Sequence, residues 1–250
     1  MYGLPKVHKS GTPLRPIISA VGTYNYKPAK YLNSILAPLV QSPLIIKDTF
    51  DFVGRVRTMD KRQDKYLVSF DVESLFTNVP TLETIEILLE LAFSNEEQTS
   101  FHGMSREELR YLLIVCTQES HFQFDGKYYD QIDGVAMGSP LGPLFANAFM
   151  SNFENKHMEK LQELGVVKWW RFVDDVFATV GSDEQVQSIV DYLNKQHPNI
   201  KFTFEREANN RLPFLDTAVV RRLNDYGTTV YRKKTYTGVY TNWTSLTARR

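Results

Sequence analysis

Two acidic sites at the ends of apolar strands constrain this chain more than any other feature of its sequence. Asp71 ends the β-rich run YLVSFD at 66–71. Farther along, Asp174 and Asp175 lie between the two apolar, β-branched halves of VVKWWRFVDDVFATV, which predicts a hairpin with acids at its tip. A carboxylate at the tip of an apolar strand is costly to desolvate unless a cation or a hydrogen-bond donor meets it. We therefore expect a cation or a hydrogen-bond donor close to each acidic site.

Whether one metal site can serve both acidic sites depends on whether the strands that carry Asp71 and Asp174 are neighbours in the sheet. If they are, Asp71 and Asp174 can converge on a pair of Mg²⁺ ions about 3.5–4 Å apart, as in two-metal phosphoryl transfer. The adjacent acids raise each other's pKa, and a cation would offset that repulsion. The alternative is a solvated turn, because Asp is common in turns. Apolar strands on both sides of each acidic site favour the metal interpretation.

Charge is divided into three blocks, although the formal net charge is zero. Residues 1–47 contain six Lys or Arg and no acid, and residues 217–250 contain seven Lys or Arg against one acid, Asp225. The middle therefore holds 29 − 13 = 16 bases and 29 − 1 = 28 acids. Basic ends around an acidic centre suit a protein that binds a polyanion and holds metal cations, but chance clustering of surface charge explains the blocks equally well.

The pattern of elements predicts an α+β fold. Helices are expected at 27–40, with Tyr31, Ile35 and Leu39 inward, at 82–93, and from 144 towards 164. Ser-x-x-Glu/Gln capping boxes at 105–108 and 182–185 predict two more helices. HFQF-DG-KYY at 121–129 predicts a hairpin, and strands are expected at 200–205, 214–221 and 228–234. The order indicates an antiparallel sheet with helices on one face.

Composition excludes several other classes of protein. With 42% hydrophobic and 23% charged residues the chain is too apolar for disorder. Its longest clean apolar run, YLLIVC at 111–116, is far short of the roughly 20 residues that a membrane span needs. The single cysteine, Cys116, excludes an internal disulfide framework and a cysteine-based zinc cluster.

The amino-terminal segment supplies cations without nearby acids. Lys6, Lys9 and Arg15 lie on a Gly/Pro-rich stretch that reads as a hairpin. They can meet a triphosphate, which an Arg would bind through a bidentate fork. The alternative is a solvated basic loop.

Five ordered blocks resemble the motifs of reverse transcriptases. YLVSFDVESLF resembles motif A, GVAMGSPLGPLFANAFM motif B and FVDD the F/Y-x-D-D of motif C, while NIKFTFE and LPFLD resemble motifs D and E. More specifically, YGLPKVHKSGTPLRPIIS, FDVESLFTNVP, GVAMGSPLGP and TTVYRKKTYT resemble Penelope-like retroelement reverse transcriptases. The resemblance covers nearly the whole chain. It implies an RNA-directed DNA polymerase with the fingers and palm of a right-hand fold and a palm sheet backed by helices.

The resemblance assigns the metal site. Asp71 and Asp174 would be the main ligands of two Mg²⁺ ions, with Mn²⁺ as a possible substitute, and Asp175 a secondary acid that shapes the site. The backbone carbonyl of Val72 would complete the coordination. The partners implied are an RNA template, a DNA primer and dNTPs.

The resemblance also implies nucleotide contacts. Lys9 and Arg15 match fingers residues that hold the incoming phosphates. Phe76 matches an aromatic below the sugar that leaves no room for a 2′-hydroxyl, although the plain alternative is a core Phe. Gly138 would let backbone approach the templating base pair, and Met137 replaces the Gln that many reverse transcriptases have before this glycine.

Template and primer contacts complete the implied site. They comprise Ser139 and Pro140 of motif B and the primer-grip turn Leu212, Pro213, Phe214 and Leu215. Lys201 lies near the position of the motif D general acid, but inside an expected strand. Trp169 and Trp170 are interpreted as mostly core.

The implied domains are fingers at 1–66, palm at 67–235 with a fingers-like hairpin near 121–135, and the start of a truncated thumb at 236–250. Location inside the cell, in the nucleus, follows from the family alone, no membrane partner is expected, and the oligomeric state is open. Two alternatives remain. One is a catalytically silent nucleic-acid-binding remnant; the other is a telomerase-type or group II intron-type reverse transcriptase.

Overall fold

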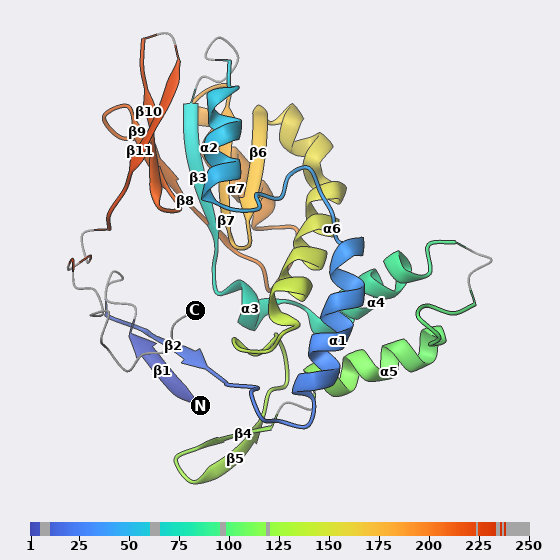
Figure 1. The fold of residues 1–250 in the computed structure, drawn as a ribbon. Coiled ribbons are helices and arrows are strands. Elements are labelled where there is room, and N and C mark those ends of the chain that lie inside the picture. The colour runs from blue at the N-terminus through green and yellow to red at the C-terminus, as the bar shows by residue number, and fades with distance from the viewer. Residues whose placement is uncertain are drawn as a thin grey trace.

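The computed structural model describes residues 1–5, 11–60, 66–95, 99–118, 121–223 and 225–233, together with 236 and 238. Within this part the chain folds into a central antiparallel sheet, helices on both of its faces, a second small sheet and two separate hairpins (Figure 1). The α+β class expected from the sequence is confirmed.

The elements follow the predicted order closely. The helices are α1 Tyr26–Leu36, the 3₁₀ turn η1 Ala37–Leu39, α2 Thr49–Arg57, α3 Leu75–Asn78, α4 Thr81–Ala92, α5 Arg106–Thr117, α6 Gly142–Glu163 and α7 Glu184–Leu193. The strands are β1 Tyr2–Pro5, β2 Leu14–Ile17, β3 Tyr66–Val72, β4 His121–Phe124, β5 Lys127–Asp130, β6 Val166–Phe172, β7 Asp175–Val180, β8 Phe202–Arg206, β9 Arg211–Phe214, β10 Thr217–Arg221 and β11 Tyr226–Val230.

The central sheet brings distant segments together in the order β6-β7-β3-β8, with every pair antiparallel. Strand β3 lies between β7 and β8, so the motif A strand is paired directly with the second strand of the predicted acidic hairpin. This pairing is the condition on which the shared acidic site depended.

Alternation along β3 gives the sheet two different faces. Val68 and Phe70 point into the larger core, which is built with α6 and α7. Leu67 points into a smaller core with Phe52 of α2 and Phe214 of the second sheet. The sequence predicted helices on one face only, whereas α2 and the three-stranded sheet β11-β10-β9 cover the other face. Helix α2 is only nine residues long, and no helix was predicted at 49–57.

Local signals in the sequence were mostly sufficient for single elements. The Ser105 side chain and Glu108 form the predicted capping box at the start of α5. Asp125 and Gly126 both take positive φ in the β4–β5 hairpin, as an Asp-Gly turn requires. The second capping box is only half formed: the Gln185 side chain accepts a hydrogen bond from the Ser182 amide at 2.9 Å, but the N-cap residue of α7 is Asp183, whose side chain makes no capping hydrogen bond.

The remaining hairpin, β1–β2, pairs Leu4 with Arg15 and lies on the side of the molecule nearest α3 (Figure 1). No helix in the described residues is long and apolar enough to cross a bilayer.

Candidate active site

The acidic residues predicted from the sequence meet at one end of the central sheet. Asp71 of β3 is the direct cross-strand partner of Asp175 of β7, and Asp174 occupies the two-residue turn between β6 and β7. Direct partners in an antiparallel pair have Cα atoms about 4.5–5.5 Å apart and side chains on the same face. The Asp174 carbonyl accepts a hydrogen bond from the Val72 amide at 3.0 Å, which ties the turn to β3. Three carboxylates thus share one end of the sheet.

Burial and the proximity of the three carboxylates raise the pKa of Asp175. Burial, together with the charges of Asp174 and Asp71, raises the pKa of this carboxyl from its ordinary value of 3.8 to about 6, while Lys233 opposes the shift. A partly buried acid next to two others is the electrostatic setting that a divalent cation relieves. Lys233 belongs to the late basic block and is thereby placed close to the acids.

This shift predicts how stability depends on pH when no metal is bound. Because the folded-state pKa of Asp175 lies above its unfolded value, the native state retains a proton that the unfolded state releases. That stabilising contribution is complete below about pH 4 and is lost as the pH rises through about 6. Asp175→Asn should therefore unfold near the wild-type temperature at pH 4 in EDTA and several degrees above it at pH 7.5.

Thermal unfolding of both proteins across this range measures the effect. Mg²⁺ at pH 7.5 should narrow the difference, because a bound cation stabilises the ionised wild-type cluster. A difference in unfolding temperature that stays constant between pH 4 and pH 7.5 would contradict the assigned electrostatics.

The donor set suits a hard cation that the protein holds only in part. Among the described residues, no three His, Cys, Asp or Glu side chains form a complete metal site. Mg²⁺ is commonly bound by one or two carboxylates plus substrate phosphates rather than by an all-protein cage. Asp71 and Asp174, with the neighbouring backbone carbonyl of Val72, offer such a partial set.

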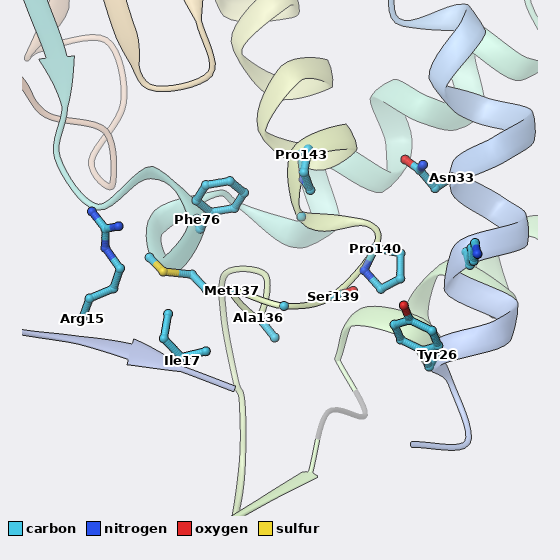
Figure 2. Close-up of a pocket in the computed structure, with 13 residues that line it drawn as sticks. Arg15, Ile17, Tyr26, Asn33, Phe76, Ala136, Met137, Ser139, Pro140 and Pro143 are labelled. Atoms are coloured by element: carbon cyan, nitrogen blue, oxygen red, sulfur yellow. The ribbon is translucent and has the colours of Figure 1, made fainter. Parts of the chain in front are cut away.

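A pocket of about 610 Å³ contains most of the predicted nucleotide and template residues. Arg15, Phe76, Met137 and Gly138 line it, and Ser139 and Pro140 join them from the motif B loop (Figure 2). These residues come from β2, α3 and the loop that leads into α6, so three segments distant in the sequence form one cavity. A volume of this size suits a nucleotide-sized ligand.

The Phe76 ring is held firmly in this pocket. It belongs to the short helix α3, whose preceding residue Ser74 takes a left-handed φ of 51°. The Phe76 carbonyl accepts from the Val135 amide at 2.7 Å. A Cβ added to Gly142 would lie only 3.2 Å from ring atom Cε1 of Phe76, so the ring rests against the first turn of α6. Phe76 is half-buried: it packs against the larger core and also lines the pocket.

Gly138 shows why motif B needs glycine. Its φ is +133°, and a Cβ there would lie 2.6 Å from the Ile18 carbonyl oxygen. The loop therefore packs directly on the backbone just after β2, which also presents Arg15 to the pocket. The close approach that Gly138 permits in this structure is to the backbone of Ile18, and its approach to a templating base pair stays a prediction.

Gly138→Ala is expected to destabilise the fold by roughly 2–3 kcal/mol, because it combines a disfavoured φ with a backbone clash. Gly126→Ala is the matched control: its φ is also positive, +73°, but nothing lies within 4 Å of the added Cβ. The control should cost about 1 kcal/mol. Free energies of unfolding in urea measure both, and equal losses would contradict the packing assigned to Gly138.

The predicted primer-grip residues divide into two groups. Leu215 lies with Asp216 in the turn between β9 and β10 and takes a left-handed φ of 53°. Pro213 and Leu215 are half-buried, whereas the Leu212 and Phe214 side chains are buried in the smaller core. The Leu212 and Phe214 side chains therefore anchor the turn in the smaller core, and a primer-grip role of the turn itself stays a prediction.

One wall of the pocket was missed by sequence reasoning. Tyr26, Lys30 and Asn33 line it from α1, together with Ile17 and Pro143 (Figure 2). Tyr26, Lys30 and Asn33 follow the i, i+4, i+7 spacing of one helix face, which was the available signal. Lys30 also belongs to the acid-free block at 1–47.

Two further expectations concern lysines and the carboxyl-terminal segment. The Lys201 ammonium donates to the Asn194 carbonyl at 2.8 Å, beyond the end of α7, and Lys201 itself lies just before β8 rather than inside it. Its role as a general acid gains no support from this contact. Lys6, Lys9 and nearly all of the expected thumb at 236–250 lie outside the described residues.

The motif C hairpin holds a second feature that the sequence did not reveal. Arg171 is fully buried on β6 and binds Glu154 of α6 through its Nε at 2.7 Å. Trp169 also donates to Glu154, at 2.9 Å, so the expectation that Trp169 is core is confirmed with an added polar contact. Glu154 falls at helical spacing from Asn147 and Ser151, the polar residues of an otherwise apolar α6 face.

Comparison with known proteins agrees with this geometry. Residues 7–207 match the family model described as reverse transcriptase (RNA-dependent DNA polymerase). No curated protein has a sequence that matches the chain.

Solved structures with the same fold include telomerase. Apo telomerase from Candida tropicalis, truncated from its C-terminal domain, has a TM-score of 0.60 at 16% identity and covers 83% of this chain. Telomerase from Candida albicans with a fragment of telomeric RNA has a TM-score of 0.56 at 10% identity and covers 84%. The RNA-dependent RNA polymerase of BmCPV at its elongation state reaches 0.52 at 14% identity and covers 85%.

The chain spans 46%, 38% and 20% of those three structures respectively, less than half of each. At these identities the likeness shows a shared polymerase fold. The family match, by contrast, covers most of the chain and includes both acidic strands and the motif B loop. The chain therefore belongs to the reverse transcriptase (RNA-dependent DNA polymerase) family.

Proposed function

We propose that this chain is the fingers-and-palm core of a retroelement reverse transcriptase of the Penelope-like type, which transfers dNTPs to a primer 3′-hydroxyl on an RNA template. The observation that carries the proposal is the register of the central sheet. It pairs Asp71 with Asp175 and fixes Asp174 beside them. The nucleotide-sized pocket lined by Phe76 supports it.

In this proposal the aspartates bind the metal ions, while Arg15 and Phe76 position the nucleotide. Asp71 and Asp174 would hold two Mg²⁺ ions, and Asp175 would set the charge of the cluster. Bound Mg²⁺ supplies activation of the primer hydroxyl and neutralises charge on the phosphates. Arg15 reaches the triphosphate through its guanidinium fork, and Phe76 occupies the space of a 2′-hydroxyl. Most of the catalysis is then positioning and electrostatics.

The template and primer would lie along the remaining walls. Tyr26 and Lys30 of α1 face the pocket opposite the nucleotide residues and suit a template strand, with Lys30 near a phosphate. The turn at Leu215 would approach the primer end with its backbone. Action in the nucleus is part of the proposal and rests on the family type.

Two alternatives compete with this type assignment. A telomerase-type enzyme is favoured by the two yeast telomerase neighbours, but the viral RNA polymerase shares the same fold, so the likeness does not separate the types. The amino-terminal sequence YGLPKVHKSGTPLRPIIS and the GVAMGSPLGP form of motif B favour the Penelope-like type. A silent nucleic-acid-binding remnant is disfavoured by three acids at one end of the central sheet, with Asp71 paired directly with Asp175 and Asp174 in the adjoining turn.

Single-nucleotide addition tests the proposal, with protein in excess over a DNA primer annealed to an RNA template. Extension with dNTPs should require Mg²⁺ or Mn²⁺ and should stop in EDTA. Binding to the primer–template that weakens steeply with salt, with no addition in either metal, would instead support the silent binder.

A further inference from the structure

The turn that carries Asp174 is conformationally strained. Phe172 pairs with Asp175, so Val173 and Asp174 form a two-residue loop. Val173 takes a φ of +56°, in the left-handed region. A β-branched residue rarely adopts this conformation, and such turns usually contain Gly or Asn. Something outside the turn has to hold it.

Two hydrogen bonds hold the carbonyl groups of the loop. The Asp174 carbonyl accepts from the Val72 amide at 3.0 Å, and the Val173 carbonyl accepts from the Arg171 guanidinium at 3.1 Å. Arg171 and Trp169 point to the helix side of the sheet, because Trp169 lies in the larger core. The carboxylates of Asp71 and Asp175 alternate to the opposite face. Arg171 therefore supports the turn from behind the acids.

The guanidinium itself has no freedom to move. Arg171 is 0% and Glu154 1% exposed. Glu154 accepts from Nε at 2.7 Å and from a terminal nitrogen at 3.2 Å, while Asn147 and Ser151 accept at 2.8 and 3.3 Å. The Arg171 backbone is held as well, by Leu44 and Ile46. A buried pair of this kind fixes geometry more reliably than it adds stability.

We propose that Arg171 is a positioning residue. Glu154 holds its guanidinium, the guanidinium donates to the carbonyl of the strained Val173, and this contact orients Asp174 beside Asp71. The planar fork matters, since a Lys keeps the charge for Glu154 but cannot also reach Asn147 and the turn. The inference concerns the catalytic role of Asp174 and in that respect rests on the proposed function. The order of the turn itself does not depend on polymerase activity.

Hydrogen exchange of the full chain measures this order directly, because the Val72 amide closes the turn. Arg171→Lys should speed exchange of the Val72 amide about tenfold. Trp169→Phe is the matched control, since it removes a bond to the same Glu154 without touching the turn. It should leave Val72 exchange unchanged.

Two further variants separate positioning from general loss of structure. Arg171→Met with Glu154→Leu leaves no unpaired buried charge and should fold, yet it should speed Val72 exchange as Arg171→Lys does. Adding Val173→Asn to Arg171→Lys should restore slow exchange, because Asn tolerates the left-handed region. Equal exchange in Arg171→Lys and Trp169→Phe, or no rescue by Asn, would overturn the proposal.

Steady-state kinetics of nucleotide addition provides a second test of the positioning role. In an active wild type, Arg171→Lys should lower kcat and raise the Mg²⁺ concentration for half-maximal rate, while the KM for dNTP stays the same. If the wild type adds no nucleotide, the proposed function fails and the exchange results still decide the role of Arg171. Normal exchange and normal kcat in Arg171→Lys would refute the positioning role alone.

Discussion

Asp174→Asn should reduce Mg²⁺-dependent nucleotide addition by at least about a thousandfold, because a metal ligand that supplies several kcal/mol of transition-state stabilisation is lost. Asn keeps the size of the side chain and leaves the backbone bond between Asp174 and Val72 in place. The fold should therefore persist. Rapid-quench measurement of single additions, in Mg²⁺ and in Mn²⁺, gives the loss.

Controls separate metal binding from a change of fold. Asp191→Asn removes an exposed carboxylate on α7, which packs on the larger-core face of the sheet, opposite the face of Asp71 and Asp175, and should leave the rate unchanged. Primer–template affinity of Asp174→Asn should stay within a few fold of wild type. Undiminished addition by a folded Asp174→Asn protein would refute the metal role of this residue.

Phe76→Ala should admit ribonucleotides. The ring lines the pocket and rests against Gly142, so its removal opens space where a 2′-hydroxyl would fit. Steric selection of this kind is lost with the side chain, and the preference for dNTP over rNTP, as a ratio of kcat/KM values, should fall by about a hundredfold. Competing single additions of dNTP and rNTP measure this ratio.

Two variants show whether the effect belongs to the ring's position. Phe76→Tyr keeps the bulk and should preserve the preference. Phe93→Ala removes another partly buried Phe, one that packs against the larger core away from the pocket, and should change stability without changing the preference. An unaltered ratio in Phe76→Ala would discard the steric gate.

Strands and turns could be predicted because their signals are local. The apolar run before Asp71, the acidic hairpin and the Asp-Gly turn each appear where the sequence places them. The expected strand at 214–221 was wrong in one respect: it breaks at Leu215, which takes a left-handed φ and reverses the chain between β9 and β10. An apolar Leu in such a turn carries no turn signal.

Helix α1 shows where periodicity fails. Tyr31, Ile35 and Leu39 have helical spacing, but Ala29, Leu32 and Leu36 are the buried residues of α1, and Tyr31 is exposed. Both stripes are apolar, and only the position of α5 against the helix decides between them. Tertiary packing, which the sequence does not display, made that choice.

The site was predictable where residue type and strand position agree. Asp71 and Asp174 combine an unusual charge with apolar flanks, which marked them as site candidates, and the resemblance to reverse transcriptases implied that they share one site. The role of Arg171 could not be predicted, because it depends on a contact with Glu154 of another element and on the positive φ of Val173. Long-range polar networks of this kind leave almost no local pattern.

The most direct measurement is anomalous diffraction from crystals of the chain grown with Mn²⁺, a primer–template and a non-hydrolysable dNTP analogue. Manganese is expected between the carboxylates of Asp71 and Asp174, about 2 Å from their oxygens, close to the Mg²⁺–oxygen distance. Crystals of Asp174→Asn should show weakened manganese density at the same place. Manganese bound to other acids, with Asp71 and Asp174 free of it while the nucleotide occupies the pocket, would contradict the account.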